Sequence, residues 1–452
     1  MSNKKFLLRI DIPAKEQEIN DFVEKYDSPI QEFFKENWDR FKQEQLFASQ
    51  LKGKQIQLPN GRKDKEYSAP FTVDSIGLPH IDSFEFENFP EGISYSKEEC
   101  SISGIPTVAG DHKITLSCVS KQGHKAEKDL LLIVVPDPKE LWKNIPTPTD
   151  IEYYKPDSDC QFLKVEANGD VARKDMVAAS QRGRSHALEA KPRDDDFVLD
   201  FDQETEWYTM VVADGAGSAK YARKGSEIAC QTALEVCKKQ LAEVGSMLED
   251  RIKLYSENSE ERKEAYEYLH QIVGKAAFEA CKEICREAEE KQCLPKDFAT
   301  TLILSICKKF DFGWFVGAFW VGDGGIGIYH KEKQEKYILG EPDGGEFAGQ
   351  TRFLTMPEIF RDRPRTWLEI VEDFTALILM TDGVTDPKFE TDANLNRIEK
   401  WNEFWDDLNG KNEDNTKVDF IDDNEQSAEQ LLKWLDFWSK GNHDDRTIAI
   451  LF

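Results

Sequence analysis

Apolar residues recur at spacings of three and four along the first fifty residues, within an otherwise charged sequence. This period is that of an amphipathic α-helix, so we expect one or two helices between about Lys15 and Gln50. Their apolar stripe requires a partner surface, either elsewhere in this chain or on another protein. The stripe consists of Ile19, Phe22, Val23, Ile30, Phe33, Phe34, Trp38, Phe41 and Phe47.

Between about Tyr67 and Val135 the pattern changes to short β-rich runs that are separated by turn clusters containing Gly or Pro. This rhythm is typical of a small antiparallel sandwich. Prolines then recur from Pro136 to Pro156 and predict a stiff linker. At 452 residues, the chain is long enough for two or three domains. We expect a helical segment over residues 1–64, a β-sandwich over 65–136, a linker over 137–158 and an independently folding domain over 159–452.

In the last two thirds of the chain, several β-rich runs lie beside an aspartate. A single Asp-Gly is most often an ordinary turn. Several strands with aspartates at their ends can focus oxygen ligands on one point, and such ligands suit Mg²⁺ or Mn²⁺ better than Zn²⁺. Gly215 lacks a Cβ, so its backbone carbonyl can approach a ligand closely. The candidate metal ligands of this pattern are Asp214 with Gly215, Asp323, Asp382 and Asp444.

An acidic stretch from about Glu390 to Ser439 carries aromatic and leucine residues at helical spacing. We expect most of them to pack against the domain. The alternative is a flap over the substrate or a surface for a partner. These residues are Trp401, Phe404, Trp405, Leu408, Leu431, Trp434, Leu435 and Trp438.

The composition argues against several partners. With 59 basic and 86 acidic residues the formal charge is −27, which repels nucleic acid and anionic membrane surfaces. The apolar runs are too short to cross a bilayer, so we expect a cytoplasmic protein. Nine scattered cysteines fit a reducing compartment. Cys281 and Cys285 lie four apart on an expected helix, but without a second ligand pair they favour packing over zinc binding.

The stretch FPEGISYSKEECSISGIPTVAGDHKITLSCVS, from Phe89 to Ser120, contains a Pro-x-Gly strand entry, an Ile-Ser-Gly-x-Pro-Thr turn and an Ala-Gly strand start. In this it resembles the Ig-like repeat family of cadherin-like sandwiches. It departs from the family at His112, where an aromatic residue is usual. Such domains bind or space other parts of a protein, so the resemblance implies a module and not an activity.

From about Arg182 to Phe452 the chain contains, in order, RGRSHALEAKPRDDDF, ADGAGS, ATTL, GDG, EFAGQTRFLT, TDGVTD and an Asp-Asp pair before the last strand. With these motifs it resembles the metal-dependent serine/threonine protein phosphatases of type 2C, and more closely a bacterial branch whose first helix opens with DGAGSAKY. The resemblance implies an α-β-β-α fold with two central antiparallel sheets. It also implies hydrolysis of phosphoserine and phosphothreonine on proteins and a signalling role with a kinase-linked partner.

The resemblance gives each acid a role. Asp214 matches the acid that bridges two metal ions, Asp382 and Asp444 match the other direct ligands of the first ion, and Gly215 matches the backbone-carbonyl ligand. Asp323 matches a position that is linked to a third, weaker ion in some members, or it is a turn residue. In this family two cations activate a bridging water, so no protein nucleophile is needed.

The residues for catalysis are predicted in the same way. Asp195 matches an acid that acts through water on the metal. The arginine that binds phosphate in the family lies shortly before this acid, and our first candidate is Arg184, with His186 and Arg193 as rivals. The family's general-acid histidine is replaced by Ala216, so protonation of the leaving group falls to water or to His186. The predicted catalytic set is Arg184, His186 and Asp195.

Two other functions share these features. One is a phosphatase fold that has lost turnover and recognises a phosphorylated partner, which Ala216 favours. The other is a regulator in which metal occupancy holds a signalling conformation. Retention of Asp214, Asp382 and Asp444 argues against lost turnover, because a decayed site does not need all three ligands.

Overall fold

The computed structural model describes residues 16–137, 140, 142–166, 173–255, 260–343, 351–361 and 363–452, and the structural statements below concern these residues. The chain forms two compact units, Met1–Leu141 and Trp142–Phe452, and each is described by itself. Part of the predicted EFAGQTRFLT motif, residues 346–350, lies outside the described residues, as do residues 1–15 and Pro138 of the predicted linker.

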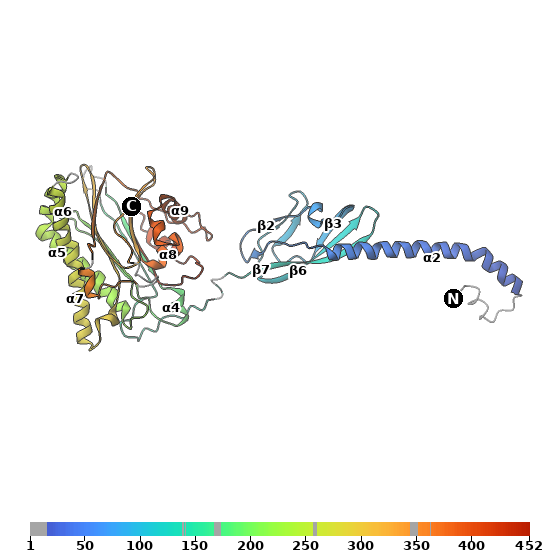
Figure 1. Ribbon diagram of the computed structural model, residues 1–452, viewed down its shortest axis with the longest axis horizontal. Helices are drawn as coiled ribbons and strands as arrows, with labels where there is room; N and C mark the ends of the chain where they lie inside the picture. The colour runs from blue at the N-terminus through green and yellow to red at the C-terminus, as the bar shows by residue number, and fades with distance from the viewer. Residues whose placement is uncertain are drawn as a thin grey trace. The chain divides into compact units, whose positions relative to one another are not determined.

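The first unit begins with a single long helix, α2 (Glu16–Gly53), which continues through Pro29 (Figure 1). Near its end, Phe47 and Leu51 are buried in the core of this unit, and the helix packs on strand β7 (Lys125–Val135). Upstream of Phe47, most of the predicted apolar stripe is exposed. The exposed residues are Phe22, Ile30, Phe33, Phe34, Trp38 and Phe41.

Two small sheets complete this unit. One has the order β1 (Gly61–Arg62), β7, β6 (Gly110–Ser120) and β3 (Ile81–Glu87), and the other the order β2 (Tyr67–Pro70), β5 (Ser101–Gly104) and β4 (Ile93–Ser96). Alternate residues of β6 and β7 are buried, which gives their sheet one apolar face. The β-rich runs therefore form strands, while the likeness to an Ig-like repeat stays a prediction.

The second unit contains two larger sheets. The five-stranded sheet has the order β10 (Asp196–Phe201), β11 (Tyr208–Ala213), β12 (Leu302–Phe310), β13 (Gly313–Val321) and β16 (Thr366–Val371). The six-stranded sheet has the order β15 (Glu335–Ile338), β14 (Gly325–His330), β17 (Ala376–Met380), β18 (Arg446–Leu451), β9 (Met176–Gln181) and β8 (Ser158–Leu163). Neighbouring strands in both sheets are antiparallel. The sheets share one apolar core that includes Met210, Trp320 and Leu379.

Helices pack on both sheets of this unit (Figure 1). Helix α5 (Ala222–Lys253) lies along β10 and β11 and is joined by α6 (Glu260–Leu269) and α7 (Lys275–Glu290). On the six-stranded side lie α8 (Asp382–Phe389), α9 (Ile398–Leu408) and α10 (Ser427–Leu435). Trp401, Trp405 and Trp434 of the acidic stretch are buried there, as expected for packing, whereas Trp438 is partly exposed. No helix in the described ranges has the length and apolar character needed to cross a membrane.

The segment from residue 142 to 157, which we expected to be linker, is bound to the second unit. Its Ile145 N–H donates to the carbonyl of Ala187 at 2.9 Å. The ammonium of Lys155 is buried and donates to the carbonyl of Asp195 at 3.0 Å. The segment is therefore a proline-containing part of the second unit. The boundary between the two compact units falls between Leu141 and Trp142.

Candidate metal centre

Asp214 directly follows β11, and neighbouring residues hold its main chain on both sides. Its N–H donates to Thr301 Oγ1 at 2.9 Å, and its carbonyl accepts from Thr301 N and Thr300 Oγ1, both at 2.8 Å. An added Cβ on Gly215 would lie 2.6 Å from the carbonyl oxygen of Asp194. Close packing therefore requires glycine at this position, and the Asp214 carboxylate projects from a rigid strand end.

Two more acids reach the same point from other strand ends. Asp382 is the first residue of α8, two residues after the end of β17, and a Cβ on Gly383 would collide with the carbonyl of Asp445. Asp323 lies in the turn between β13 and β14, where the hydroxyl of Thr351 donates to its Oδ2. Carboxylate oxygens of Asp214, Asp323 and Asp382 all lie within 4.8 Å of one another.

The electrostatics of this group fit a bound cation. Burial, together with repulsion from neighbouring aspartates, raises the pKa of Asp214 and of Asp382 well above the ordinary range. Within the described part of the chain, Oδ1 of Asp323 and Oδ1 of Asp382 are buried and accept no hydrogen bond. A divalent cation with oxygen ligands offsets both costs, so the residues present fit Mg²⁺ or Mn²⁺.

Asp195 lies directly before β10 and is completely buried. Its Oδ2 accepts hydrogen bonds from Thr447 Oγ1 at 2.7 Å and from Thr381 Oγ1 at 3.0 Å, while its Oδ1 has no partner among the described residues. Burial, followed by the charge of Asp445, raises the pKa of Asp195 to about 7. The Asp195 carboxylate is thus held in one orientation, and its Oδ1 remains available for another partner.

Asp444 and Asp445 precede β18 and have different surroundings. Asp445 is buried: its Oδ1 accepts the N–H of Gly183 at 2.5 Å and lies 3.2 Å from His186 Nδ1, and its Oδ2 accepts the N–H of Asp194 at 2.5 Å. Among the described residues, Oδ1 of Asp444 accepts the N–H of the next residue alone, at 2.9 Å. Asp445 therefore orders the loops around the site, and Asp444 is the one with capacity for a ligand.

His186 lies in the short helix α4 (Arg184–Leu188), and its Nε2 is 4.0 Å from Asp194 Oδ2. Burial acts to lower the pKa of His186, but the hydrogen bond and charge of Asp445 outweigh it and raise this pKa to about 9. The imidazole is therefore protonated at neutral pH. Ala216 is buried, and its N–H donates to the carbonyl of Ala299 at 2.9 Å.

The arginine candidates point to other partners. Arg184 Nη2 donates to Asp436 Oδ1 at 3.0 Å, and Arg193 is buried with Nη1 donating to the carbonyl of Ser180 at 3.3 Å. For Arg184 to bind a phosphate, it must exchange this carboxylate partner. The assignment of a phosphate-binding arginine stays a prediction.

A protein-family model described as Protein phosphatase 2C matches residues 182–436, which is more than half of the chain. The chain belongs to the protein phosphatase 2C family. It is thus an enzyme of a class of metal-dependent serine/threonine phosphatases that act on phosphorylated proteins, as the sequence predicts. The matched range contains Asp195, Asp214, Asp323 and Asp382 and ends before Asp444.

Solved structures of serine/threonine phosphatases are among those similar to this chain. A serine-threonine phosphatase 2C from Toxoplasma gondii is 16% identical, covers 65% of this chain and 98% of its own, and has a TM-score of 0.41. The serine/threonine phosphatase Stp1 from Staphylococcus aureus is 14% identical, covers 68% and 96%, and has a TM-score of 0.37. A search of curated proteins found no match. The family assignment accordingly rests on the family model.

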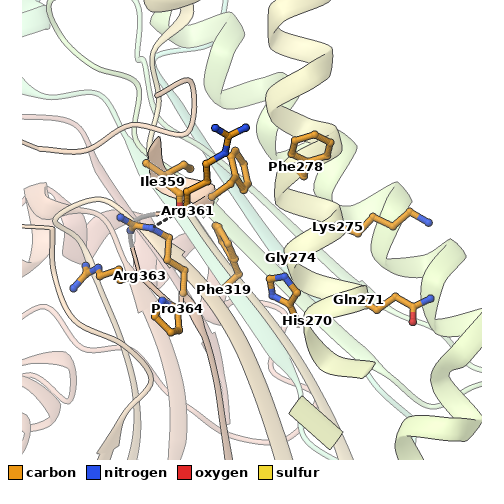
Figure 2. A pocket seen from close by; sticks show the side chains of 12 residues that line it. His270, Gln271, Gly274, Lys275, Phe278, Phe319, Ile359, Arg361, Arg363 and Pro364 are labelled. Atoms are coloured by element: carbon orange, nitrogen blue, oxygen red, sulfur yellow. Dashed lines mark hydrogen bonds between the residues drawn. The ribbon is translucent and has the colours of Figure 1, made fainter. Parts of the chain in front are cut away.

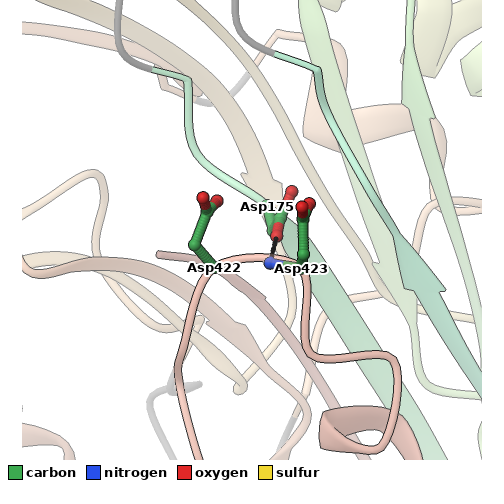
Figure 3. A group of neighbouring side chains, drawn as sticks. All are labelled: Asp175, Asp422 and Asp423. Carbon is green, nitrogen blue, oxygen red and sulfur yellow. Dashed lines mark hydrogen bonds between the residues drawn. The ribbon is translucent and has the colours of Figure 1, made fainter.

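This protein phosphatase 2C member has a second acidic group in its described residues, made of Asp175, Asp422 and Asp423 (Figure 3). Both oxygens of Asp175 are in use, because Oδ1 accepts the N–H of Val165 and Oδ2 the N–H of Asp423, each at 2.8 Å. Lys164 Nζ also lies 3.0 Å from Asp423 Oδ2. These contacts tie two loops together and give the group a structural role, in contrast to the unpartnered oxygens at Asp323 and Asp382.

Sequence reasoning missed the residues that hold the phosphatase site in place. Thr381 and Thr447 fix Asp195, and Asp445 joins the loop of Gly183 to that of Asp194. The Asp-Asp pair that contains Asp445 is visible in the sequence. The sequence does not show which of the two acids is buried and hydrogen-bonded to the neighbouring loops. Thr381 is the first residue of the TDGVTD motif, but the motif does not show that its hydroxyl binds Asp195, and Thr447 has no signal of its own, since a strand threonine is common.

Proposed function

We propose that the second unit hydrolyses phosphoserine and phosphothreonine on proteins by using a water activated between two Mg²⁺ or Mn²⁺ ions. The observation that carries the proposal is the convergence of Asp214, Asp323 and Asp382, with buried oxygens that lack partners. We assign Asp444 and the carbonyl of Gly215 to complete the set of ligands. Membership of the protein phosphatase 2C family supports the reaction class.

When bound, two such ions lower the pKa of a shared water and offset the charge of the phosphate. The contribution of the protein is to hold the acidic side chains in fixed positions. Asp214 is carried by a strand end whose main chain is held by Thr300 and Thr301, and Asp195 is oriented by two threonine hydroxyls. Preorganised acids of this kind avoid a reorganisation cost during reaction.

The leaving oxygen of serine or threonine needs a proton, and Ala216 cannot donate one. We propose His186 for this step, because the nearby Asp445 carboxylate favours the protonated form of its ring and lies 3.2 Å from its Nδ1. Its Nε2 is 4.0 Å from Asp194 Oδ2. Water is the alternative donor.

The physiological substrate is proposed only by class. Members of the family act on phosphorylated proteins. We propose that the substrate belongs to a kinase-linked signalling system, in which a phosphatase reverses the modification that the kinase adds.

The test is hydrolysis of a phosphothreonine peptide by the full chain in Mn²⁺, with and without EDTA. We expect turnover that chelation abolishes and added Mn²⁺ restores. Asp422→Asn, which alters an exposed acid of the second acidic group, is the matched control and should keep wild-type turnover. Turnover that survives thorough chelation would contradict the proposal. Binding of the peptide without turnover would favour the alternative, a phosphatase fold that only recognises its partner.

A further inference from the structure

A pocket of about 630 Å³ opens on the helical side of the second unit (Figure 2). It is bounded on one side by the π-helical turn η2 (His270–Gly274) and the start of α7, and on the other by the segment that precedes β16. None of the proposed metal ligands lines it. Its volume lies within the range of small-molecule sites, roughly 300–1,000 Å³.

The floor and one wall of this pocket are apolar. Phe319 and Ile359 are buried, and the ring of Phe360 stacks on that of Phe319 with centroids 6.5 Å apart. The ring of Phe278, on α7, meets that of Phe360 edge to face at 5.3 Å and remains 46% exposed. A large aromatic side chain half open to solvent beside a hollow is a surface that an apolar ligand can cover.

The π-helical turn shapes the polar side of the pocket. His270 Nδ1 lies 3.0 Å from Thr366 Oγ1, and this contact fixes the orientation of the ring. A Cβ on Gly274 would lie 2.7 Å from that ring, so the glycine makes room for the imidazole where it now lies. Single π-helical turns occur frequently at functional sites, because they change the face that a helix presents.

Cationic side chains surround the pocket in a chain whose formal charge is −27. Arg363 and Arg365 both pair with the buried Asp343, at 2.7 Å and 2.5 Å. Arg361 and Lys275 line the same pocket and are exposed, and no carboxylate of the described residues pairs with either. Positive potential is therefore concentrated at this mouth within a generally acidic surface.

The pocket is also connected to the turn that carries Asp323. Asp343, which the two arginines hold, accepts the N–H of Gly322 at 3.0 Å through Oδ2, and its own N–H donates to the Gly322 carbonyl at 2.9 Å. Gly322 is the residue before Asp323. Arg363 and Arg365 also line the pocket, so a ligand bound there lies beside a hydrogen-bonded unit that reaches the residue before Asp323.

We propose that this pocket is a regulatory binding site for a small molecule in which an apolar body carries one anionic group, a carboxylate or a phosphate. The apolar body lies on the Phe319, Ile359 and Phe360 floor against Phe278, and the anion meets Arg361 at the mouth of the pocket. The regulatory part rests on the proposed function, because it acts through Asp323. The binding part does not.

The binding test compares two probes with the same apolar body, 1-naphthaleneacetate and its neutral amide, by calorimetric titration of the full chain. We expect the acetate to bind more tightly than the amide. Arg361→Glu should weaken acetate binding at least about fivefold, since like charges then meet, and leave amide binding unchanged. Phe278→Ala should weaken both probes. Arg286→Glu, an exposed charge reversal on the same helix, is the matched control and should change neither.

Three results would each overturn the proposed binding site. The two probes could bind with equal affinity, neither could bind, or Arg361→Glu could fail to weaken binding of the acetate. The regulatory part is tested by titrating Mn²⁺ with and without saturating acetate, and we expect the Mn²⁺ Kd to change about fivefold or more, a typical size for coupled sites. An unchanged Mn²⁺ Kd would overturn the regulatory part of the proposal, while the proposal of a binding site would stand. Failure of Mn²⁺ to bind at all would instead overturn the proposed function.

Discussion

Asp444 and Asp445 are the same residue type at adjacent positions, yet they hold different parts of the site. Both carboxylate oxygens of Asp445 accept hydrogen bonds, from the N–H groups of Gly183 and Asp194, and one of them also pairs with His186. Among the described residues, the carboxylate of Asp444 accepts one backbone N–H. Burial acts to raise the pKa of Asp445, but the hydrogen bond and charge of His186 outweigh it and lower this pKa. Asp445 is therefore an ionised, structural acid.

Substitution separates these two roles. Asp445→Ala leaves the buried His186 cation and two N–H groups without an acceptor, so we expect a loss of about 3–5 kcal/mol in the free energy of unfolding. Asp444→Ala should change it by less than about 1 kcal/mol and weaken Mn²⁺ binding instead. Chemical denaturation in EDTA and calorimetric Mn²⁺ titration give the two quantities. Equal destabilisation by both variants would show that the two aspartates share one role.

Asp214→Asn and Asp382→Asn test the ligand assignment directly. Each should abolish turnover at saturating Mn²⁺, because an amide is a much weaker metal ligand than a carboxylate. In metal-free buffer each should raise the free energy of unfolding by about 0.5–2 kcal/mol, since mutual repulsion now raises the pKa of both acids. The measurements are peptide hydrolysis and urea denaturation. Near-wild-type turnover in either variant would make the assignment wrong.

At the scale of elements, the strand ends could be predicted from the sequence. An apolar run that is followed by an aspartate anticipates both β11 before Asp214 and β17 before Asp382. The hydroxyls that hold Asp195 could not be predicted, since Thr381 and Thr447 lie 186 and 252 residues away along the chain. Such contacts depend on strand order and register, which local periodicity does not contain.

The segment from residue 142 to 157 shows the same limit. Its prolines predict a stiff linker, and nothing local reveals that Lys155 donates to the carbonyl of Asp195 and to Ser226 Oγ. We therefore expect a fragment of residues 142–452 to fold and to hydrolyse p-nitrophenyl phosphate in Mn²⁺. A fragment of residues 159–452 should be insoluble or much less active, because the Lys155 contacts are lost.

Lys155→Met in the full chain isolates this contact from the rest of the segment. It keeps the length of the aliphatic stem and removes the donor, so we expect lower activity with the fold retained by circular dichroism. Full activity of the fragment 159–452 would restore the boundary that the sequence suggests near Asp159.

At the scale of the whole molecule, the chemistry lies in the second unit and the first carries no comparable set of acids among its described residues. Its aromatic stripe on α2 is exposed, and we propose that this unit docks the protein substrate. We expect the fragment 142–452 to match the full chain on p-nitrophenyl phosphate and to be slower on the protein substrate, because docking raises the effective concentration. Comparison of kcat/KM for both substrates gives the result; equal loss on both would show that the first unit supports the fold instead.

We propose that Asp214, Asp323 and Asp382 form the metal centre of this phosphatase. Anomalous scattering from crystals of the full chain grown with Mn²⁺ tests this assignment most directly, because it locates the ions without reference to activity. We predict manganese peaks beside these three carboxylates, which disappear in Asp382→Asn crystals, and no strong peak at Asp175, Asp422 and Asp423. Manganese at the second group, or no peak beside the first in saturating Mn²⁺, would contradict it.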